Sequence, residues 1–200
     1  MTHHNSTSHR YPELVVFGWD AVSWDLIEPW LEEGSLPTLS GLMERGSSAE
    51  IRSTHIPVSP AAWSSIITGV NPGQHGVFDW YQRAPESYAM EYVHTGRNQA
   101  VPLWTYMNEA GKTVGVVNLP MVYPAVPVDG FMISGMAAPG PEAYGFSFPP
   151  DLINSIEEEL GPYMMDEGVV FKTGQEQPYF DAQLDWIEYQ KELVNYLIEN

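Results

Sequence analysis

Asp20 and Ser59 are the two residues whose types and settings best support chemistry at a shared site. Asp20 follows a short apolar run, and Ser59 precedes Pro60 at the start of a segment with helical spacing. A carboxylate binds hard or borderline cations such as Zn²⁺, Mn²⁺ or Mg²⁺. A bound cation can also activate a serine hydroxyl as a nucleophile without a histidine base. The pair therefore suits phosphoryl transfer at one shared cation.

Each of these residues also has an ordinary structural explanation. An aspartate after a strand often caps a helix or stabilises a turn. A serine before a proline often marks the start of a helix. Neither of these roles needs a cation. The hypothesis of a reactive site therefore depends on the pair of residues more than on either Asp20 or Ser59 alone.

The stretch from Ser59 to Trp80 has the order expected of a helix followed by tight turns. After the opening serine and proline come a helical segment, the stop signal Thr68-Gly69, the turn Asn71-Pro72-Gly73 and the dipeptide His75-Gly76. Unpaired N–H groups and the helix dipole attract anions to a helix N-terminus. The order therefore places the Ser59 hydroxyl where an incoming anion would bind.

The remaining segments alternate between strand-like and helix-like patterns. Strands are expected over residues 13–18, 48–54, 113–118 and 131–135. Further helices are expected over residues 23–33, 37–45, 103–110, 150–160 and 178–199. The run 13–18 is apolar throughout, as in parallel strands that are buried on both faces. The alternation predicts an α/β fold with a doubly wound, mostly parallel sheet flanked by helices.

A chain of 200 residues is long enough for one domain of ordinary size. Residues 1–12 are polar and are expected to form a flexible N-terminal tail. Residues 13–200 are expected to belong to a single α/β domain. Within this domain, residues 137–178 are rich in Pro and Gly at their start and are expected to form a loop excursion or a cap.

The charge of the chain excludes some classes of partner. Its 26 acidic and 8 basic residues give a net charge of −18, which repels duplex nucleic acid and anionic membranes. The acidity serves either solubility or adaptation to a high-salt cytoplasm, where salt screens the repulsion. The chain has no cysteine, no apolar run of membrane-spanning length and no signal-peptide pattern, so a cytoplasmic location is expected.

Three segments together resemble a known family. They are Val-Val-Phe-Gly-Trp-Asp at 15–20, the whole of 59–80, and Val-Val-Asn-Leu-Pro-Met-Val-Tyr-Pro at 116–124. Their order resembles that of the type I phosphodiesterase/nucleotide pyrophosphatase family, within the alkaline phosphatase superfamily. The resemblance covers about residues 13–136. It implies an alkaline-phosphatase-like α/β fold and a hydrolase that acts on phosphate diesters or nucleotide pyrophosphates.

The resemblance also implies roles for single residues. Asp20 matches the aspartate after the first strand, which binds a catalytic metal. Ser59 matches the nucleophile, usually a threonine, whose oxygen binds the same metal and is transiently phosphorylated. The spacing agrees, because Ser59 lies ten residues before Gly69 and sixteen before His75. The implied cofactors are two divalent ions, Zn²⁺ or else Mn²⁺ or Mg²⁺, and the implied substrate is a small phosphate ester or a nucleotide. His75 matches a turn residue and not a ligand.

The sequence departs from the family pattern at three places, of which serine in place of the usual threonine at position 59 is chemically tolerable. Some members have an asparagine twenty-one residues after the nucleophile, where it holds a phosphate oxygen; this chain has Trp80 there. Asn118, at the end of an expected strand, is a weak candidate to replace that amide, and a turn-forming role is its alternative. The family also completes its metal site with Asp and His ligands in a C-terminal half, including an Asp-His-Gly motif. This sequence has no Asp-His pair and no histidine after His94.

The missing ligands lead to two expectations. The chain is expected to be the amino-terminal portion of a family member, so that its fold is incomplete. The alternative is a catalytically incomplete fragment or a non-catalytic α/β module for binding or partner recognition. In either case, the long helix at 178–199 carries aromatic residues that need to be covered. Self-association through this helix is therefore expected.

Overall fold

The computed structural model describes residues 12–166 and 168–200, and in these it contains seven α-helices, one 3₁₀ helix and five strands. In chain order they are α1 (Trp24–Glu32), α2 (Pro37–Arg45), α3 (Ser59–Thr68), α4 (Pro72–His75), β1 (Tyr81–Arg83), β2 (Met90–Tyr92), η1 (Thr95–Arg97), α5 (Leu103–Glu109), β3 (Val114–Leu119), β4 (Gly130–Ser134), β5 (Ser147–Phe148), α6 (Leu152–Leu160) and α7 (Glu176–Glu199). The expected α/β class is confirmed. The tail expected over residues 1–12 lies outside the described residues apart from Pro12.

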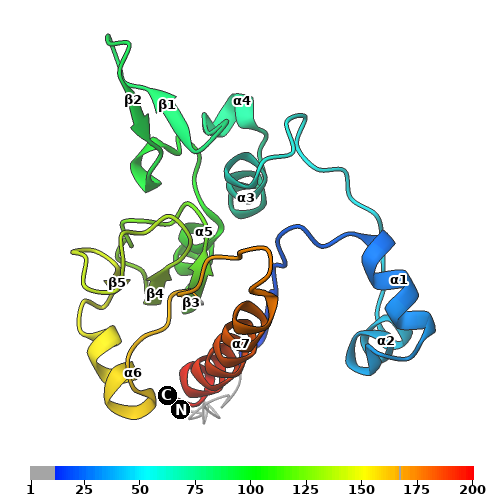
Figure 1. Ribbon diagram of the computed structural model, residues 1–200. Helices are drawn as coiled ribbons and strands as arrows, with labels where there is room; N and C mark the ends of the chain where they lie inside the picture. The colour runs from blue at the N-terminus through cyan, green and yellow to red at the C-terminus, as the bar shows by residue number, and fades with distance from the viewer. Residues whose placement is uncertain (1–11, 167) are drawn as a thin grey trace, which may run out of the picture.

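A three-stranded sheet in the order β3-β4-β5 forms the centre of the molecule (Figure 1). Strands β3 and β4 are parallel, with Val114 opposite Gly130 and Val117 opposite Ile133. Strand β5 joins the other side of β4 in the antiparallel direction. The sheet is therefore mixed, and in the described part of the chain its parallel portion consists of the β3–β4 pair.

The two faces of this sheet are covered by different helices because neighbouring strand residues point to opposite sides. Val116 and Met132 belong to a buried cluster with Ile67 of α3 and Trp104 of α5. The next residue on β4, Ile133, belongs to a second cluster. That cluster contains Phe146 of the loop before β5, together with Ile153 and Ile156 of α6 and Tyr189 and Leu193 of α7. The sheet therefore lies between α3 and α5 on one side and α6 and α7 on the other.

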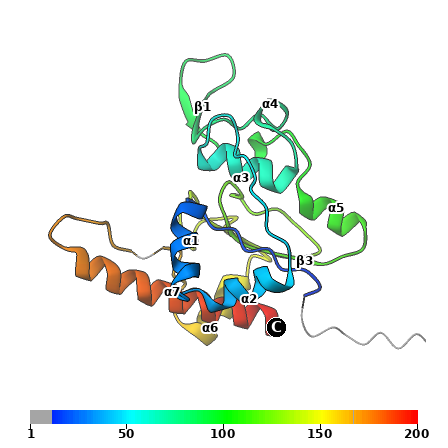
Figure 2. The ribbon, with the colours of Figure 1, turned by 90° about the vertical axis from the view of Figure 1, so that its right-hand side faces the viewer.

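Residues 137–178 contribute directly to this architecture. They include β5, which pairs with β4, and α6, which buries Ile153 and Ile156 in the core. Helix α7 then runs for 24 residues, and its C-terminal half packs against α6 (Figure 2). Tyr189 and Leu193 of α7 are buried, whereas Phe180, Leu184 and Ile187 are each more than half exposed. The expected helix at the C-terminal end is thus present, with a solvent-exposed apolar stripe near its start.

Two expected strands are absent from the structure. Residues 13–18 are extended but pair with no strand, and Leu14, Val16 and Phe17 are exposed. Residues 48–54 also lack strand structure. The run 13–18 is instead held near its two ends. The Lys112 ammonium lies 2.9 Å from the Glu13 carboxylate, and the Gly18 backbone packs against the Trp63 side chain. An apolar run forms a strand only where a sheet edge supplies partners for its backbone N–H and C=O groups. Residues 13–18 have no partner strand in the described part of the chain, and the two contacts attach the ends of the segment to the rest of the protein.

Helices α1 and α2 contact each other and lie to one side of the sheet, in agreement with the two expected helices (Figure 1). Ile27 is the buried residue of α1, and α2 has none. The β1–β2 hairpin projects at the opposite end of the molecule, beyond α3 and α4 (Figure 2). Among the described residues, no helix combines the length and the apolar character needed to cross a membrane.

Candidate functional site

Ser59 is the first residue of α3, as the sequence predicts. Val58 before it is extended, with φ −111° and ψ 144°, and Pro60 occupies the first turn, where its fixed φ suits a helix start. Pro60 and Ala61 are buried, while Ser59 itself is half-buried. The residues after Ser59 therefore anchor the start of the helix, and the serine lies at the boundary between the packed interior and the solvent.

The end of α3 is connected to the next turn by His75. This residue is fully buried at the end of α4. Its Nδ1 accepts a hydrogen bond from the Val77 N–H at 3.1 Å, so in the neutral ring the proton is on Nε2. Nε2 lies 2.9 Å from the Ser65 Oγ and donates to it. Burial lowers the pKa of His75, which favours this neutral form.

His75 therefore has a structural role in this geometry. Both of its ring nitrogens are engaged, one by the backbone of Val77 and one by Ser65 on α3. The ring also interacts with the Ala61 backbone, which partly opposes the lowering of the His75 pKa by burial. The hydrogen bond to Ser65 joins α3 to the α4 turn across ten residues of sequence. The expectation from the resemblance, that His75 is a turn residue, agrees with this arrangement. Sequence reasoning did not identify Ser65 as its partner, because nothing in the local pattern distinguishes Ser65 from Ser64.

Asp20 lies in an exposed turn just before α1. Its Oδ1 accepts a hydrogen bond from the Ala21 N–H at 2.9 Å, and Ala21 has a left-handed φ of 56°. In this structure Asp20 thus stabilises a turn, which is the ordinary alternative that the sequence left open. Its role as a metal ligand stays a prediction.

The segment that carries Asp20 is attached to the helix that carries Ser59. Gly18 packs so closely against Trp63 that a Cβ atom at position 18 would overlap the indole. Trp63 is four residues after Ser59, which places both side chains on the same face of α3. The tertiary structure therefore brings the two segments with the predicted site residues into contact through Gly18 and Trp63.

Asn118 lies at the end of β3, where the register with β4 is irregular and its own φ is 57°. Its Nδ2 donates to the Gln190 Oε1 at 2.7 Å, and its Oδ1 accepts from the Tyr163 hydroxyl at 2.9 Å. Burial raises the pKa of Tyr163 and keeps this hydroxyl protonated as a donor. Both ends of the Asn118 amide thus have partners within the protein, and its role in substrate binding stays a prediction.

A divalent ion in a protein needs four or more ligands. In residues 12–166 and 168–200, no group of three or more His, Cys, Asp or Glu side chains lies close enough together to hold one. Asp20 and Ser59 supply one carboxylate and one hydroxyl. The donor set that the structure describes is therefore too small to form a complete metal site.

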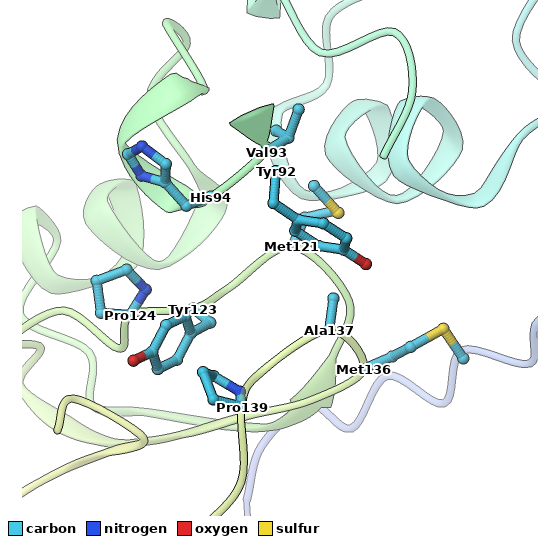
Figure 3. A pocket seen from close by; sticks show the side chains of 9 residues that line it. All are labelled: Tyr92, Val93, His94, Met121, Tyr123, Pro124, Met136, Ala137 and Pro139. Carbon is cyan, nitrogen blue, oxygen red and sulfur yellow. The ribbon is translucent and has the colours of Figure 1, made fainter. Parts of the chain in front are cut away.

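A cavity of about 430 Å³ lies beside the β1–β2 hairpin, and its walls are mainly apolar (Figure 3). Neither Asp20 nor Ser59 is among the residues that line it. Sequence reasoning did not find this cavity, because its residues come from three segments that are irregular in pattern. The many prolines around residues 120–127 indicated a loop, but they gave no sign of what the loop encloses.

Comparison with protein families gives one result. A family model described as type I phosphodiesterase / nucleotide pyrophosphatase matches residues 14–194, which is most of the chain. The comparisons with curated proteins and with solved structures gave no match.

Proposed function

Because the chain belongs to the type I phosphodiesterase/nucleotide pyrophosphatase family, we propose that it hydrolyses phosphate diesters or nucleotide pyrophosphates through a Ser59 nucleophile. The family match over residues 14–194 is the observation that carries this proposal. The proposed substrate is a small phosphate ester or a nucleotide. Duplex nucleic acid is disfavoured, because a chain with a net charge of −18 repels a polyphosphate backbone.

The position of Ser59 supports its proposed role. It begins a ten-residue helix and is half-buried, and a helix N-terminus favours the negative charge of a phosphate group. In the proposed reaction the Ser59 Oγ forms a bond to phosphorus while the bond to the leaving-group oxygen breaks. Water then cleaves the phosphoserine, which releases the phosphoryl product and restores the hydroxyl.

The proton of Ser59 has to leave as the new bond to phosphorus forms. His75 is unsuited to accept it, because its Nδ1 is bonded to the Val77 N–H and its Nε2 already carries a proton that it donates to Ser65. Burial also lowers the pKa of His75 and so weakens it as a base. His75 is therefore not the base, and in the proposed step the Ser59 proton passes to solvent water as the leaving-group oxygen departs from phosphorus.

The proposal includes dependence on divalent metal ions, as the resemblance implies. Such an ion would lower the pKa of the serine hydroxyl and stabilise charge on phosphate. Asp20 and Ser59 are the residues proposed to bind it. Since the described donor set is too small for a complete site, we assign no step of the reaction to the ion. Calorimetric titration with Zn²⁺ and Mn²⁺ tests this part of the proposal. Binding that Asp20→Asn weakens supports it, and no binding contradicts it for this chain.

The nucleophile is tested by substitution. We expect Ser59→Ala to lower the rate of diester hydrolysis by a factor on the order of 10³ or more, because it removes the attacking oxygen. Ser59→Thr should keep activity, since threonine also provides a hydroxyl. Ser53→Ala, which alters an exposed serine upstream, is the matched control. The measurement is release of nitrophenol from bis(4-nitrophenyl) phosphate with added Zn²⁺ or Mn²⁺.

Three outcomes of this assay are informative. Loss of turnover in Ser59→Ala alone supports the proposed nucleophile. Undiminished turnover in Ser59→Ala contradicts it. Absence of turnover in the unsubstituted protein favours the non-catalytic alternative, in which the α/β fold serves binding.

A further inference from the structure

The cavity beside the β1–β2 hairpin has the position and the lining of a ligand site. It measures about 430 Å³, a size suited to a small organic molecule. Its walls come from the end of the hairpin, the segment after β3 and the segment after β4 (Figure 3). The lining residues are Tyr92, Val93, His94, Met121, Tyr123, Pro124, Met136, Ala137 and Pro139. We propose that this cavity binds an uncharged aromatic ring.

The topology of the sheet supports a ligand at this place. Strand β3 ends at Leu119 and β4 ends at Ser134, and the two strands are parallel. Met121 follows the first strand by two residues, and Met136 and Ala137 follow the second by two and three. In open α/β sheets, ligands bind beyond the carboxyl ends of the parallel strands. The cavity lies at that edge of the β3–β4 pair.

The backbone of the cavity wall is strained at two residues. Met121 has a φ of 66° and Ala137 a φ of 79°, in the left-handed region that residues with a Cβ seldom adopt. Such a backbone conformation is costly, and residues that adopt it gather at ligand sites. The cavity wall at Met121 and Ala137 therefore has a backbone conformation that the surrounding structure must hold in place, unlike that of a relaxed loop.

Contacts behind and across the cavity hold its walls in place. Met121 and Val93 are buried together with Val77 in a small core cluster. The Thr95 N–H donates to the Tyr123 carbonyl at 2.8 Å, which joins the segment after the hairpin to the segment after β3. The Tyr123 hydroxyl donates to the Tyr144 carbonyl at 3.0 Å and fixes the orientation of that ring. These contacts hold the walls of the cavity in one conformation, which limits the rearrangement that binding a ligand would require.

The chemistry of the lining favours an aromatic ring over an aliphatic group. Tyr92 and Tyr123 provide ring faces and edges, and contacts between aromatic rings are favourable beyond the burial of apolar area alone. The sulfur atoms of Met121 and Met136 also make favourable contacts with aromatic rings. Methionine side chains are flexible as well, so they adjust to the shape of the ring.

The lining also favours an uncharged ligand. Among its nine residues none is Asp, Glu, Lys or Arg. His94 is the one residue of this lining whose side chain can carry a positive charge, and its Nδ1 accepts a hydrogen bond from the Gly96 N–H. A charged group against the apolar walls formed by the other residues would lose hydration without gaining an ion pair, which is unfavourable. The proposal does not depend on the proposed hydrolase activity, because it needs neither a metal ion nor a phosphate ester. An experiment can therefore contradict the binding of an aromatic ring while the hydrolase activity stands, and the reverse is also true.

Nuclear magnetic resonance of ¹³C-methyl methionine tests the proposal directly. Of the nine methionines in the chain, Met121 and Met136 line the cavity, and Met121→Leu and Met136→Leu assign their signals. The probe is p-cresol, and 4-methylcyclohexanol is its aliphatic counterpart with the same carbon skeleton. We expect saturable ring-current shifts of these two methyl signals with p-cresol, and a Kd at least about fivefold weaker for 4-methylcyclohexanol.

Blocking variants complete the test. Met136→Trp and Pro139→Trp fill the cavity from two different walls, and each is expected to weaken p-cresol binding at least about tenfold. Met90→Trp, on an exposed methionine of β2 outside the cavity, should leave binding unchanged. If one of the two blocking variants fails to fold, p-cresol binding by the other variant decides whether the cavity is the binding site. Equal affinity for the two probes, shifts spread over all methionines, or undiminished binding in the folded blocking variants overturns the proposal.

Discussion

The backbone of Gly18 lies against the indole of Trp63 so closely that a Cβ at position 18 would overlap the ring. This contact attaches the extended segment that ends at Asp20 to the helix that begins at Ser59. Trp63 is itself buried, so its ring is held by the core and is not free to move aside. The spatial relation between the two predicted site residues thus depends on one glycine and one aromatic ring.

The first prediction concerns this contact. Gly18→Ala should lower the free energy of unfolding by about 1–3 kcal/mol, because the new methyl group forces Trp63 or the backbone to shift. The measurement is denaturation by urea.

Gly41→Ala in α2 is the matched control for Gly18→Ala. A Cβ at position 41 meets only the flexible end of Arg45, so this change should stabilise the helix by about 0.5–1 kcal/mol. Equal effects of the two substitutions would contradict the importance of the Gly18–Trp63 contact.

The second prediction separates two neighbouring serines of α3. The Ser64 Oγ is buried and, within the described part of the chain, has no hydrogen-bond partner. Ser64→Ala should therefore raise the free energy of unfolding by about 1 kcal/mol, because it removes an unsatisfied hydroxyl. Ser65→Ala should lower it by about 1 kcal/mol, because it removes the hydrogen bond between the Ser65 Oγ and the His75 Nε2. Thermal denaturation of the two variants checks the opposite signs, and a change of the same sign in both would contradict the assigned hydrogen bonds.

The third prediction concerns pH. Burial lowers the pKa of folded His75 below its ordinary value of 6.5, so below that pH the unfolded chain binds a proton that the folded chain does not. This histidine therefore makes stability fall as the pH decreases below 6.5. His75→Gln should show a smaller loss of unfolding free energy between about pH 7.5 and about pH 5.5 than the unsubstituted protein. Urea denaturation at both pH values gives the difference, and an identical loss in both proteins would argue against a lowered pKa.

The fourth prediction concerns the network around Asn118. Gln190 accepts from the Asn118 Nδ2 and donates from its own Nε2 to the Met164 carbonyl at 3.1 Å. Gln190→Leu leaves both of these groups without partners and should cost about 1–3 kcal/mol. Gln177→Leu, at an exposed position of the same helix, should change stability by less than about 0.5 kcal/mol. Chemical denaturation distinguishes the two, and a neutral Gln190→Leu would show that the network is not needed for stability.

The fifth prediction concerns the exposed stripe of Phe180, Leu184 and Ile187 on α7. We predict that the chain self-associates through this stripe, and that added salt strengthens the association by screening its net charge of −18. Leu184→Glu should shift the population to monomers in light scattering. Glu188→Gln, an exposed neighbour on the same helix, is the control. A monodisperse monomer at high salt would contradict the prediction.

Local signals in the sequence were enough to locate most helices and the family motif. Pro60 and Gly69 mark the start and the end of α3 because each has a backbone preference that acts at its own position. The α/β class followed from the alternation of segments, and the order of residues in 59–80 was enough for the resemblance. The family match over residues 14–194 confirms that resemblance.

Features that depend on distant partners required the tertiary structure. The apolar run 13–18 has the composition of a buried strand, yet whether it pairs depends on which sheet edge it reaches, and here it pairs with none. Asn118 has the position of a ligand-binding amide, but Gln190, 72 residues later in the chain, occupies its Nδ2. The aromatic-lined cavity is assembled from three separate segments. Backbone preferences are properties of neighbouring residues and can be found in the sequence, whereas hydrogen-bond partners and cavities arise only when the folded chain brings distant residues together.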